Sequence, residues 1–500
     1  MRLLLCWVIA LFGAATSAFA QDGAWLRAET PGFIVYSTSS ETRVRRLAEE
    51  LESFDSLLRR MTQTTAPRSP TKLEIYLFNG PGQFQEAFPG ESSMVRGRYG
   101  ARPDIIAAYA IFRDREGLEA QDVLFHEYAH HFMYQYFANT YPAWYVEGFA
   151  EFASTVAFED TRIVIGRASG VRAEWLQSGS WLPMEQLIEG MPRDGEGVSR
   201  FYAQSWLFVH YIISTEGMTA KFQAYLRALR LGAPAAEAFQ TGFGMTPAEM
   251  QSALRAYFRS SPNALALTRP VVTESQGVTI THLPVTANAM LPLTTRIRRG
   301  MLSDEDAAEL LARMRRMVLN PRDRFAILSL AEAEVSYGDI AAARAFLEPY
   351  NAANPNDVQA LYLLGRTYSR EAEEADERDD DAARDAARSQ ARRYYTRAFR
   401  IDGNHAPTLY RYAQTFAGTT LDASSENALN ALLLAHQLAP QVPDITFMAA
   451  DWLLAAERPA EAIPMLRVIA FNPHGGESAD RAKEMLARAE AALSAQPRAQ

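Results

Sequence analysis

The chain has 500 residues, of which 48% are hydrophobic and 22% are charged, and its formal net charge at pH 7 is −9. This length and composition exclude a disordered or fibrous protein and predict about two to four globular domains. The mildly negative charge gives no basis for nucleic-acid binding.

The first twenty residues have the pattern of an export signal. Arg2 precedes an apolar run from Leu3 to Ala15, and Ser17-Ala18-Phe19-Ala20 is an A-x-A cleavage site. We therefore expect residues 1–20 to be a secretory signal peptide and the mature protein to be periplasmic, with secretion to the medium as the alternative. The run is too short for a membrane anchor, and no later run reaches transmembrane length. The only cysteine, Cys6, lies inside the signal, so we expect no disulfide.

Residues 21–118 alternate between strand-like and helix-like patterns. An amphipathic helix is predicted over 41–61. Short strands, recognised by alternating apolar residues and flanking turns, are predicted at 32–36, 72–78, 96–99 and 105–110. This part of the chain is expected to form the α/β portion of a catalytic unit.

The most informative motif is His126-Glu127-Tyr128-Ala129-His130, which has the pattern H-E-x-x-H within a helix predicted over 119–138. Positions i and i+4 share one helix face, so the two imidazoles can bind one metal ion while the Glu reaches the water on it. Apolar neighbours indicate a buried helix, in which these polar groups would be costly without partners. We expect one zinc ion per chain, and a hydrogen-bonded pair of core histidines is the alternative.

A second helix follows directly after Pro142. Glu147 and Glu151 are an i, i+4 pair on it, and the surrounding apolar residues indicate that it is buried. One carboxylate can complete the zinc site, while the other can orient a histidine ligand from behind. A solvated acidic face is the alternative interpretation.

H-E-x-x-H followed by W-x-x-E-G-F-A (from Trp144) resembles the gluzincin clan (peptidase MA-like) of zinc metallopeptidases, which includes thermolysin-like enzymes and membrane alanyl aminopeptidases. The resemblance covers about residues 120–260. It implies that His126, His130 and Glu147 are the zinc ligands. It further implies that Glu127 is the general base and that Glu151 is a carboxylate that contacts the ligands without binding zinc. The His-to-Glu spacing is shorter than in the best-known members, which leaves Glu151 as an alternative ligand. The Met-Glu-Asn signature of aminopeptidases is missing, so aminopeptidase activity is not implied.

The same resemblance implies a hydrogen-bond donor for the oxyanion on a later helix. Tyr202, at the start of a helix predicted to run to Thr215, matches it by position, and a phenol donates without adding a charge. His210 is the second candidate, and an ordinary half-buried tyrosine is the alternative. Gluzincins also bind extended substrate on a sheet edge above the zinc helix. We expect 104–112 to be that edge, or else an interior strand.

Residues 119–260 are expected to complete a helical zincin core, and the proline-containing segment 261–300 a connector against it. From 301 to 496 the chain is predicted to form Ala- and Leu-rich helix pairs. Their ends recur 34, 48, 37 and 33 residues apart, at Asn320-Pro321, Asn354-Pro355, Asp402-Gly403, Ala439-Pro440 and Asn472-Pro473. This region resembles tetratricopeptide repeats, whose concave surface binds peptides or partner proteins.

The expected fold is therefore α+β, a thermolysin/aminopeptidase-like zincin domain followed by an all-α TPR-like superhelix. The expected function is an exported zinc metallopeptidase that hydrolyses peptide bonds and uses its repeats to bind substrate or a protein partner. The alternative is a non-catalytic periplasmic scaffold or assembly protein that keeps a vestigial zincin domain.

Overall fold

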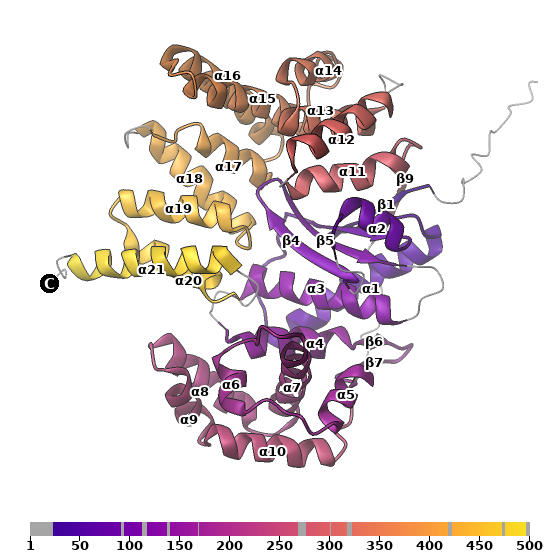
Figure 1. The fold of residues 1–500 in the computed structure, drawn as a ribbon, viewed down its shortest axis with the longest axis vertical. Helices are drawn as coiled ribbons and strands as arrows, with labels where there is room; N and C mark the ends of the chain where they lie inside the picture. Colours follow the sequence, from indigo (N-terminus) through magenta and orange to yellow (C-terminus); the bar gives the residue numbers. More distant parts are fainter. Residues whose placement is uncertain are drawn as a thin grey trace, which may run out of the picture.

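The computed structural model describes residues 24–91, 95–112, 118–137, 141–168, 170–268, 277–300, 302–317, 323–418, 423–472 and 476–496. The expected signal peptide, 1–20, lies outside these residues. Three parts are visible in Figure 1: a mixed sheet with its helices, a lower helical lobe, and an arc of helices that runs from beside the sheet to the C-terminus. In the part of the chain described, no helix is long and apolar enough to cross a membrane.

A six-stranded sheet forms the centre of the N-terminal part. Its spatial order is β4-β5-β3-β2-β1-β9, in which β2, β3 and β5 run parallel and the other strands pair antiparallel. The strands are β1 Leu26–Glu29, β2 Phe33–Ser37, β3 Leu73–Phe78, β4 Gly97–Arg102, β5 Ile105–Ile111 and β9 Thr279–His282. Among the described strands, β4 therefore ends the sheet and has a neighbour on one side only.

Side chains alternate between the two faces of the sheet along each strand, and helices pack against both faces. One face, with residues such as Val35 and Ile75, packs on α1 (Glu41–Thr62) and α3 (Leu118–Tyr136). The other face, with Phe78, packs under α2 (Pro81–Ala87) and α11 (Ala287–Arg299). Helix α3 thus lies under β4 and β5, where it meets the edge of the sheet.

The lower lobe, as far as the structure describes it, consists of seven helices and a three-stranded sheet of order β6-β7-β8. Its helices are α4 Ala143–Ser154, α5 Gly170–Gln177, α6 Met184–Glu189, α7 Gly195–Ser214, α8 Met218–Arg230, α9 Ala235–Phe243 and α10 Pro247–Arg259. Its strands are β6 Ala157–Phe158, β7 Arg162–Ile165 and β8 Leu265–Thr268. Helix α7 begins earlier than the sequence predicted, because Asp194 caps it by accepting a hydrogen bond from the backbone N–H of Gly197. Tyr202 therefore lies inside the helix instead of at its start.

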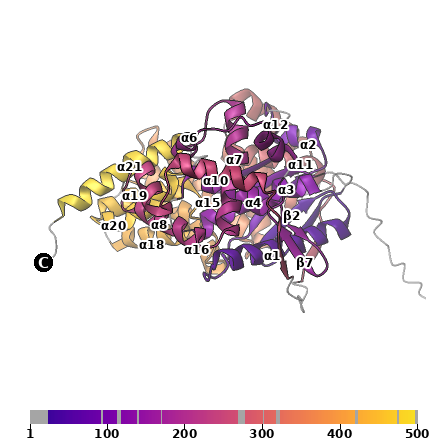
Figure 2. The same ribbon diagram turned by 90° about the horizontal axis from the view of Figure 1, so that it is seen from below.

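The C-terminal part is a stack of antiparallel helix pairs that curves around the sheet (Figure 1). The pairs are α11 with α12 (Asp304–Met317), α13 (Arg324–Tyr337) with α14 (Ile340–Ala353), α15 (Val358–Asp376) with α16 (Asp381–Ile401), α17 (Ala406–Gln414) with α18 (Ala423–Leu438), and α19 (Pro443–Ala455) with α20 (Pro459–Ala470); α21 (Gly476–Ala495) closes the stack. Seen from below, α18–α21 extend to one side of the lower lobe (Figure 2).

Two segments differ from their sequence-based descriptions. The predicted edge, 104–112, is β5, an interior strand between β4 and β3. Every residue of β5 is buried, and a strand of this kind is covered on both faces. The predicted connector, 261–300, supplies β8, β9 and α11. Helix α11 shares a core with α12 and α13, so the helical stack starts at Ala287 and includes Pro292 within its first helix.

A buried ion cluster joins the sheet to the helical stack. Asp104, in the turn between β4 and β5, accepts a hydrogen bond from the Tyr362 hydroxyl of α15. Its carboxylate lies 3.0 Å from Arg411 Nη2 of α17 and 3.8 Å from Arg366 Nη1 of α15. Burial alone would raise the pKa of Asp104, but the two guanidinium groups outweigh burial and hold it well below the ordinary range.

We expect Asp104→Asn to destabilise the protein by about 3 kcal/mol at pH 7, because two buried guanidinium groups lose their counter-charge. A carboxylate with a lowered pKa contributes stability above its unfolded pKa of about 4, and that stability is lost as the pH falls through the folded pKa. The difference from the wild type should therefore shrink below about pH 4. Urea unfolding at pH 7 and at acidic pH measures it, with the exposed Glu309→Gln as control. Equal midpoints at pH 7 would show that the cluster does not hold the two parts together.

Candidate metal centre

Helix α3 presents its two motif histidines on the face turned away from α1. Its opposite face is fixed by Phe125, whose ring stacks on Phe54 of α1 with centroids 4.4 Å apart, and by Tyr128, whose hydroxyl donates to Asp55. His130 is 3% exposed, and its Nε2 lies 3.0 Å from Nε2 of His126. The i, i+4 spacing therefore places the two ring nitrogens close enough to bind one metal ion.

Helix α4 places Glu147 opposite these nitrogens. Glu147 Oε2 lies 3.7 Å from Nε2 of His126 and 3.5 Å from Nε2 of His130. The position of α4 depends on Gly148, because a Cβ there would lie 2.3 Å from the carbonyl oxygen of Ser205 on α7. Trp144 also stacks on Phe208 of α7, with centroids 4.2 Å apart. The glycine of the E-G-F-A motif thus permits the close α4–α7 contact that positions its neighbour.

These three side chains fit a zinc ion. One ligand atom from each lies within 4.8 Å of the other two. In a tetrahedral site with bonds of about 2.0–2.2 Å, ligand atoms are roughly 3.4 Å apart, and the three separations here are 3.0, 3.7 and 3.5 Å. Two imidazoles and one carboxylate are also a donor set typical of catalytic zinc. Glu147 has no solvent exposure, and a buried carboxylate needs positive charge nearby.

The pKa values of the two histidines move in opposite directions. Burial, followed by the nearby His130, lowers the pKa of His126. Burial would also lower the pKa of His130, but Glu147 outweighs it and the net shift is upward. The directions differ because burial and the neighbouring ring prevail at His126, whereas the Glu147 carboxylate prevails over burial at His130.

Glu151, one turn after Glu147, lies behind the cluster. Its Oε1 is 3.4 Å from Nδ1 of His126, the ring nitrogen turned away from the other two ligands. Arg172 of α5 binds the same carboxylate through two hydrogen bonds of 2.7 Å. Glu151 therefore lies on the side of His126 away from the three converging atoms, a position from which it can orient the ring. No sequence pattern singles out Arg172, because it comes from a separate short helix.

Tyr202 lies beside the cluster, on α7. Its ring centroid is 6.2 Å from that of His126, and the guanidinium carbon of Arg172 lies 5.0 Å from its ring centroid. Burial, then the Glu147 and Glu151 carboxylates, raise the pKa of the phenol. A phenolate here would add a third negative charge, so the hydroxyl keeps its proton and remains a donor.

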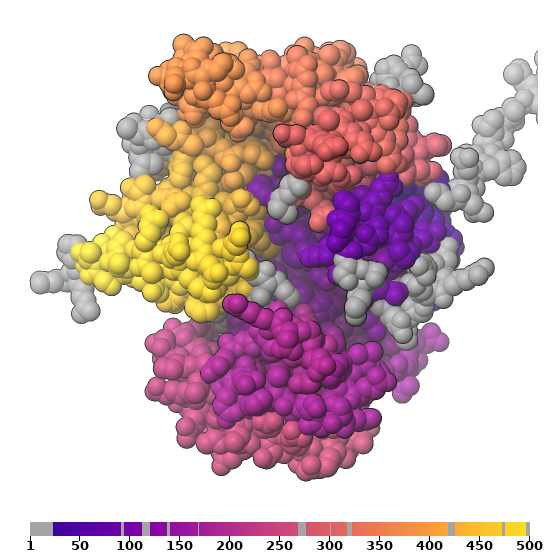
Figure 3. All heavy atoms as spheres, in the orientation of Figure 1, coloured from indigo at the N-terminus to yellow at the C-terminus, as the bar shows by residue number. Residues whose placement is uncertain are grey.

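A cavity of about 460 Å³ opens over these residues. Its floor is α3 and its side is β4, and Glu127, Tyr134 and Tyr202 all line it. The third wall comes from the helical stack, through Gln441, Pro443, Ile469, Asn472 and Ser478. In the space-filling view the yellow C-terminal helices come down beside the magenta lower lobe (Figure 3). The sequence did not predict this wall, which is more than 300 residues from the motif.

Two other histidines lie away from the cavity. His131 is buried, with Nδ1 3.1 Å from the Tyr99 hydroxyl, and burial lowers its pKa to about 3. His210, the second candidate for an oxyanion donor, is also buried, and its Nδ1 lies 2.8 Å from the Tyr257 hydroxyl of α10. That contact holds α7 against α10, so His210 is a packing residue.

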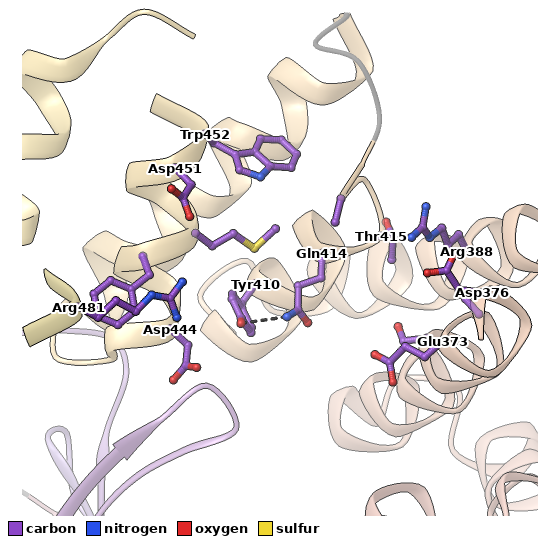
Figure 4. Close-up of a pocket in the computed structure, with 15 residues that line it drawn as sticks. Glu373, Asp376, Arg388, Tyr410, Gln414, Thr415, Asp444, Asp451, Trp452 and Arg481 are labelled. Carbon is purple, nitrogen blue, oxygen red and sulfur yellow. Dashed lines mark hydrogen bonds between the residues drawn. The ribbon is translucent and has the colours of Figure 1, made fainter. Parts of the chain in front are cut away.

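A second hollow lies on the helix pairs, between α15, α17, α19 and α21. Figure 4 shows its side chains gathered around Tyr410 and Gln414, whose amide donates to the tyrosine hydroxyl at 2.9 Å. Four carboxylates and two guanidinium groups line it, from Glu373, Asp376, Asp444, Asp451, Arg388 and Arg481. Trp452, labelled in Figure 4, contributes an apolar surface, and Met448 and Phe447 also line the hollow. This groove is a surface of the helical stack that a protein segment could occupy.

Comparisons with known proteins add little to this description. No protein-family model matches the sequence, and no curated protein is significantly similar to it. Among solved structures, a thermophilic TPR protein from Thermus thermophilus is similar to part of the chain. The identity is 20%, the match covers 41% of this chain and 98% of that protein, and the TM-score is 0.31. A score this low does not establish a common fold.

We expect the purified protein to contain about one zinc ion per chain. His130→Ala removes one of three ligands and should reduce the zinc content to near zero, whereas the exposed His282→Ala should leave it unchanged. Inductively coupled plasma mass spectrometry after dialysis measures both. Equal zinc content in the two variants would place the metal elsewhere.

Proposed function

We propose that this protein is an exported zinc metallopeptidase that hydrolyses peptide bonds. The observation that carries the proposal is the convergence of His126, His130 and Glu147 at the base of one cavity that also holds Glu127 and Tyr202. A general base and a neutral donor beside a metal-ligating cluster are the groups that metal-assisted hydrolysis requires. The signal-like residues 1–20 support export to the periplasm.

His126, His130 and Glu147 would hold the ion, which supplies Lewis-acid activation of water and of a substrate carbonyl. Glu127 takes the proton from the attacking water as the C–O bond forms, and then transfers it to the leaving nitrogen as the C–N bond breaks. The Tyr202 hydroxyl donates a hydrogen bond to the carbonyl oxygen as negative charge develops on it. Glu151, held by Arg172, keeps the His126 ring in the orientation that ligation needs.

The position of the edge strand β4 favours a peptide as the substrate. Gly97, Tyr99 and Ala101 of β4 line the cavity, and among the described strands β4 pairs with β5 alone. The backbone groups on its outer side can therefore pair with an extended chain. Gly97 also permits a close approach to α3, since a Cβ there would lie 2.3 Å from Val123 and 3.8 Å from Glu127. An extended substrate on β4 would thus lie next to the general base.

The groove on the helical stack supports a second part of the proposal, the binding of substrate or a protein partner by the helix pairs. Its aromatic and charged lining suits a flexible segment better than a small molecule. The same groove supports the competing function of a non-catalytic scaffold. In that case the helix pairs would carry the function by binding a partner protein, and substitution of Glu127 would leave that binding unchanged.

We expect Glu127→Gln to reduce peptide hydrolysis by about 10²- to 10⁴-fold, because the amide cannot accept the proton of water. Zinc content should remain at the wild-type level, since Glu127 is not a ligand. Hydrolysis of a fluorescence-quenched octapeptide pool and zinc content are measured together, with the exposed Glu185→Gln as control. Cleavage at the wild-type rate by Glu127→Gln would exclude this mechanism.

We expect Tyr202→Phe to lower kcat by about 10²- to 10³-fold with little change in KM, because the hydroxyl acts on charge that exists only in the transition state. Tyr211 lies on the same helix and packs against Tyr257. The matched control Tyr211→Phe should leave both constants unchanged. Steady-state kinetics with one cleaved peptide distinguishes them. An unchanged kcat in Tyr202→Phe would mean that Tyr202 is a packing residue.

A further inference from the structure

The cavity wall contributed by the helical stack contains one unusual residue, Gln441. It lies in the turn between α18 and α19 and is 6% exposed. It lines the same cavity as His126 and Glu127. A residue of the helical stack therefore lies across the cavity from the metal-ligating helix.

The amide of Gln441 has unused hydrogen-bonding capacity. It makes a weak hydrogen-bonding contact with the Tyr99 hydroxyl, and neither Nε2 nor Oε1 has a hydrogen bond of good geometry to any residue that the structure describes. Buried amide groups are normally paired, and an unpaired one lowers the stability of the folded state. By contrast, the buried amide of Gln204 in the lower lobe binds both the N–H and the C=O of Leu182. That pairing shows that a buried carboxamide can hydrogen-bond to the N–H and the C=O of one backbone segment at the same time.

We infer that Gln441 is a substrate-contacting residue whose carboxamide binds the backbone N–H and C=O of a peptide in the cavity. A carboxamide offers one acceptor and one donor group, which are the complements of the two backbone groups. This inference rests on the proposed function and adds that the helical stack forms part of the active site. The substrate then lies in the cavity that β4 and the turn before α19 both line.

The turn that carries Gln441 is held firmly enough to act as a fixed wall. Ala439 and Val442, on either side, are 1% exposed each, and the Val442 N–H donates to the Ala439 carbonyl. Nearby, the Tyr134 hydroxyl of α3 donates to Asn472 Oδ1 at 2.7 Å, which ties the end of α20 to the metal-ligating helix. Together with the Asp104 cluster and the packing of α11 on the sheet, this hydrogen bond fixes the position of the helical stack relative to the cavity.

The lining of this wall indicates the class of substrate. Gln441, Asn472 and Ser478 are uncharged, and Arg98 on the β4 side is already paired with Glu91. Neutral hydrogen-bonding groups recognise the peptide backbone and do not select a charged chain end or side chain. The expected substrate is therefore an extended, unfolded segment with relaxed side-chain specificity.

The test replaces Gln441 with Met, which has a similar volume and no hydrogen-bonding amide. We expect kcat/KM for the fluorescence-quenched octapeptide pool to fall about tenfold, mainly through KM, since up to two hydrogen bonds to the substrate backbone are lost. The thermal midpoint of the substrate-free protein should stay the same or rise, because an unpaired buried amide is removed. The exposed Gln437→Met on α18 is the matched control and should change neither quantity.

A binding experiment separates this inference from the proposed function. It compares two zinc-loaded proteins, Glu127→Gln alone and Glu127→Gln combined with Gln441→Met, for binding of a fluorescein-labelled octapeptide pool. If the wild type cleaves no peptide, the proposed function fails, but weaker binding on Gln441→Met would still support the role of Gln441. Equal binding with and without the change, or no binding by either protein, would overturn the inference. A lower thermal midpoint for Gln441→Met would also overturn it, because it would show that the amide supports the fold.

Discussion

The buried charge of Glu147 is the constraint on which the site depends. Its side chain has no solvent exposure, so its charge must be balanced by neighbouring groups. Two imidazoles on α3 face it, and α7 lies close behind it because Gly148 has no side chain. The positions of α3, α4 and α7 are therefore linked, and a small movement of one of them would separate the ligand atoms. The packing of α4 on α7, through Gly148 and through Trp144 stacked on Phe208, opposes that movement.

The helical stack is a structural part of the cavity. It packs on the sheet through α11, contacts the β4–β5 turn through Asp104 and reaches α3 through Asn472, and it supplies one wall of the cavity. An appended helical repeat that only recruited partners would not need to cover the site. Because it does, residues of the helical stack and of β4 line one and the same cavity.

Local sequence patterns were enough to predict several features. The spacing of His126 and His130 predicts one helix face, and the structure places their ring nitrogens together with Glu147. The edge of the sheet was not predicted, because the fully apolar β5 has a stronger strand signal than the glycine- and arginine-rich β4. Gln441 could not be found from local pattern at all. Its role depends on a contact between segments more than 300 residues apart, and local periodicity contains no information on such contacts.

The hairpin of β4 and β5 contacts two different parts of the molecule, the helical stack at its turn and α3 at the other end of β4. Asp104 in the turn is bound by α15 and α17, and Gly97, at the opposite end of β4, lies against Glu127. A strand of six residues is about 20 Å long and stiff along its axis. The hairpin therefore spans the distance from the helical stack to the helix that carries the H-E-x-x-H motif, and it fixes the position of β4 relative to both.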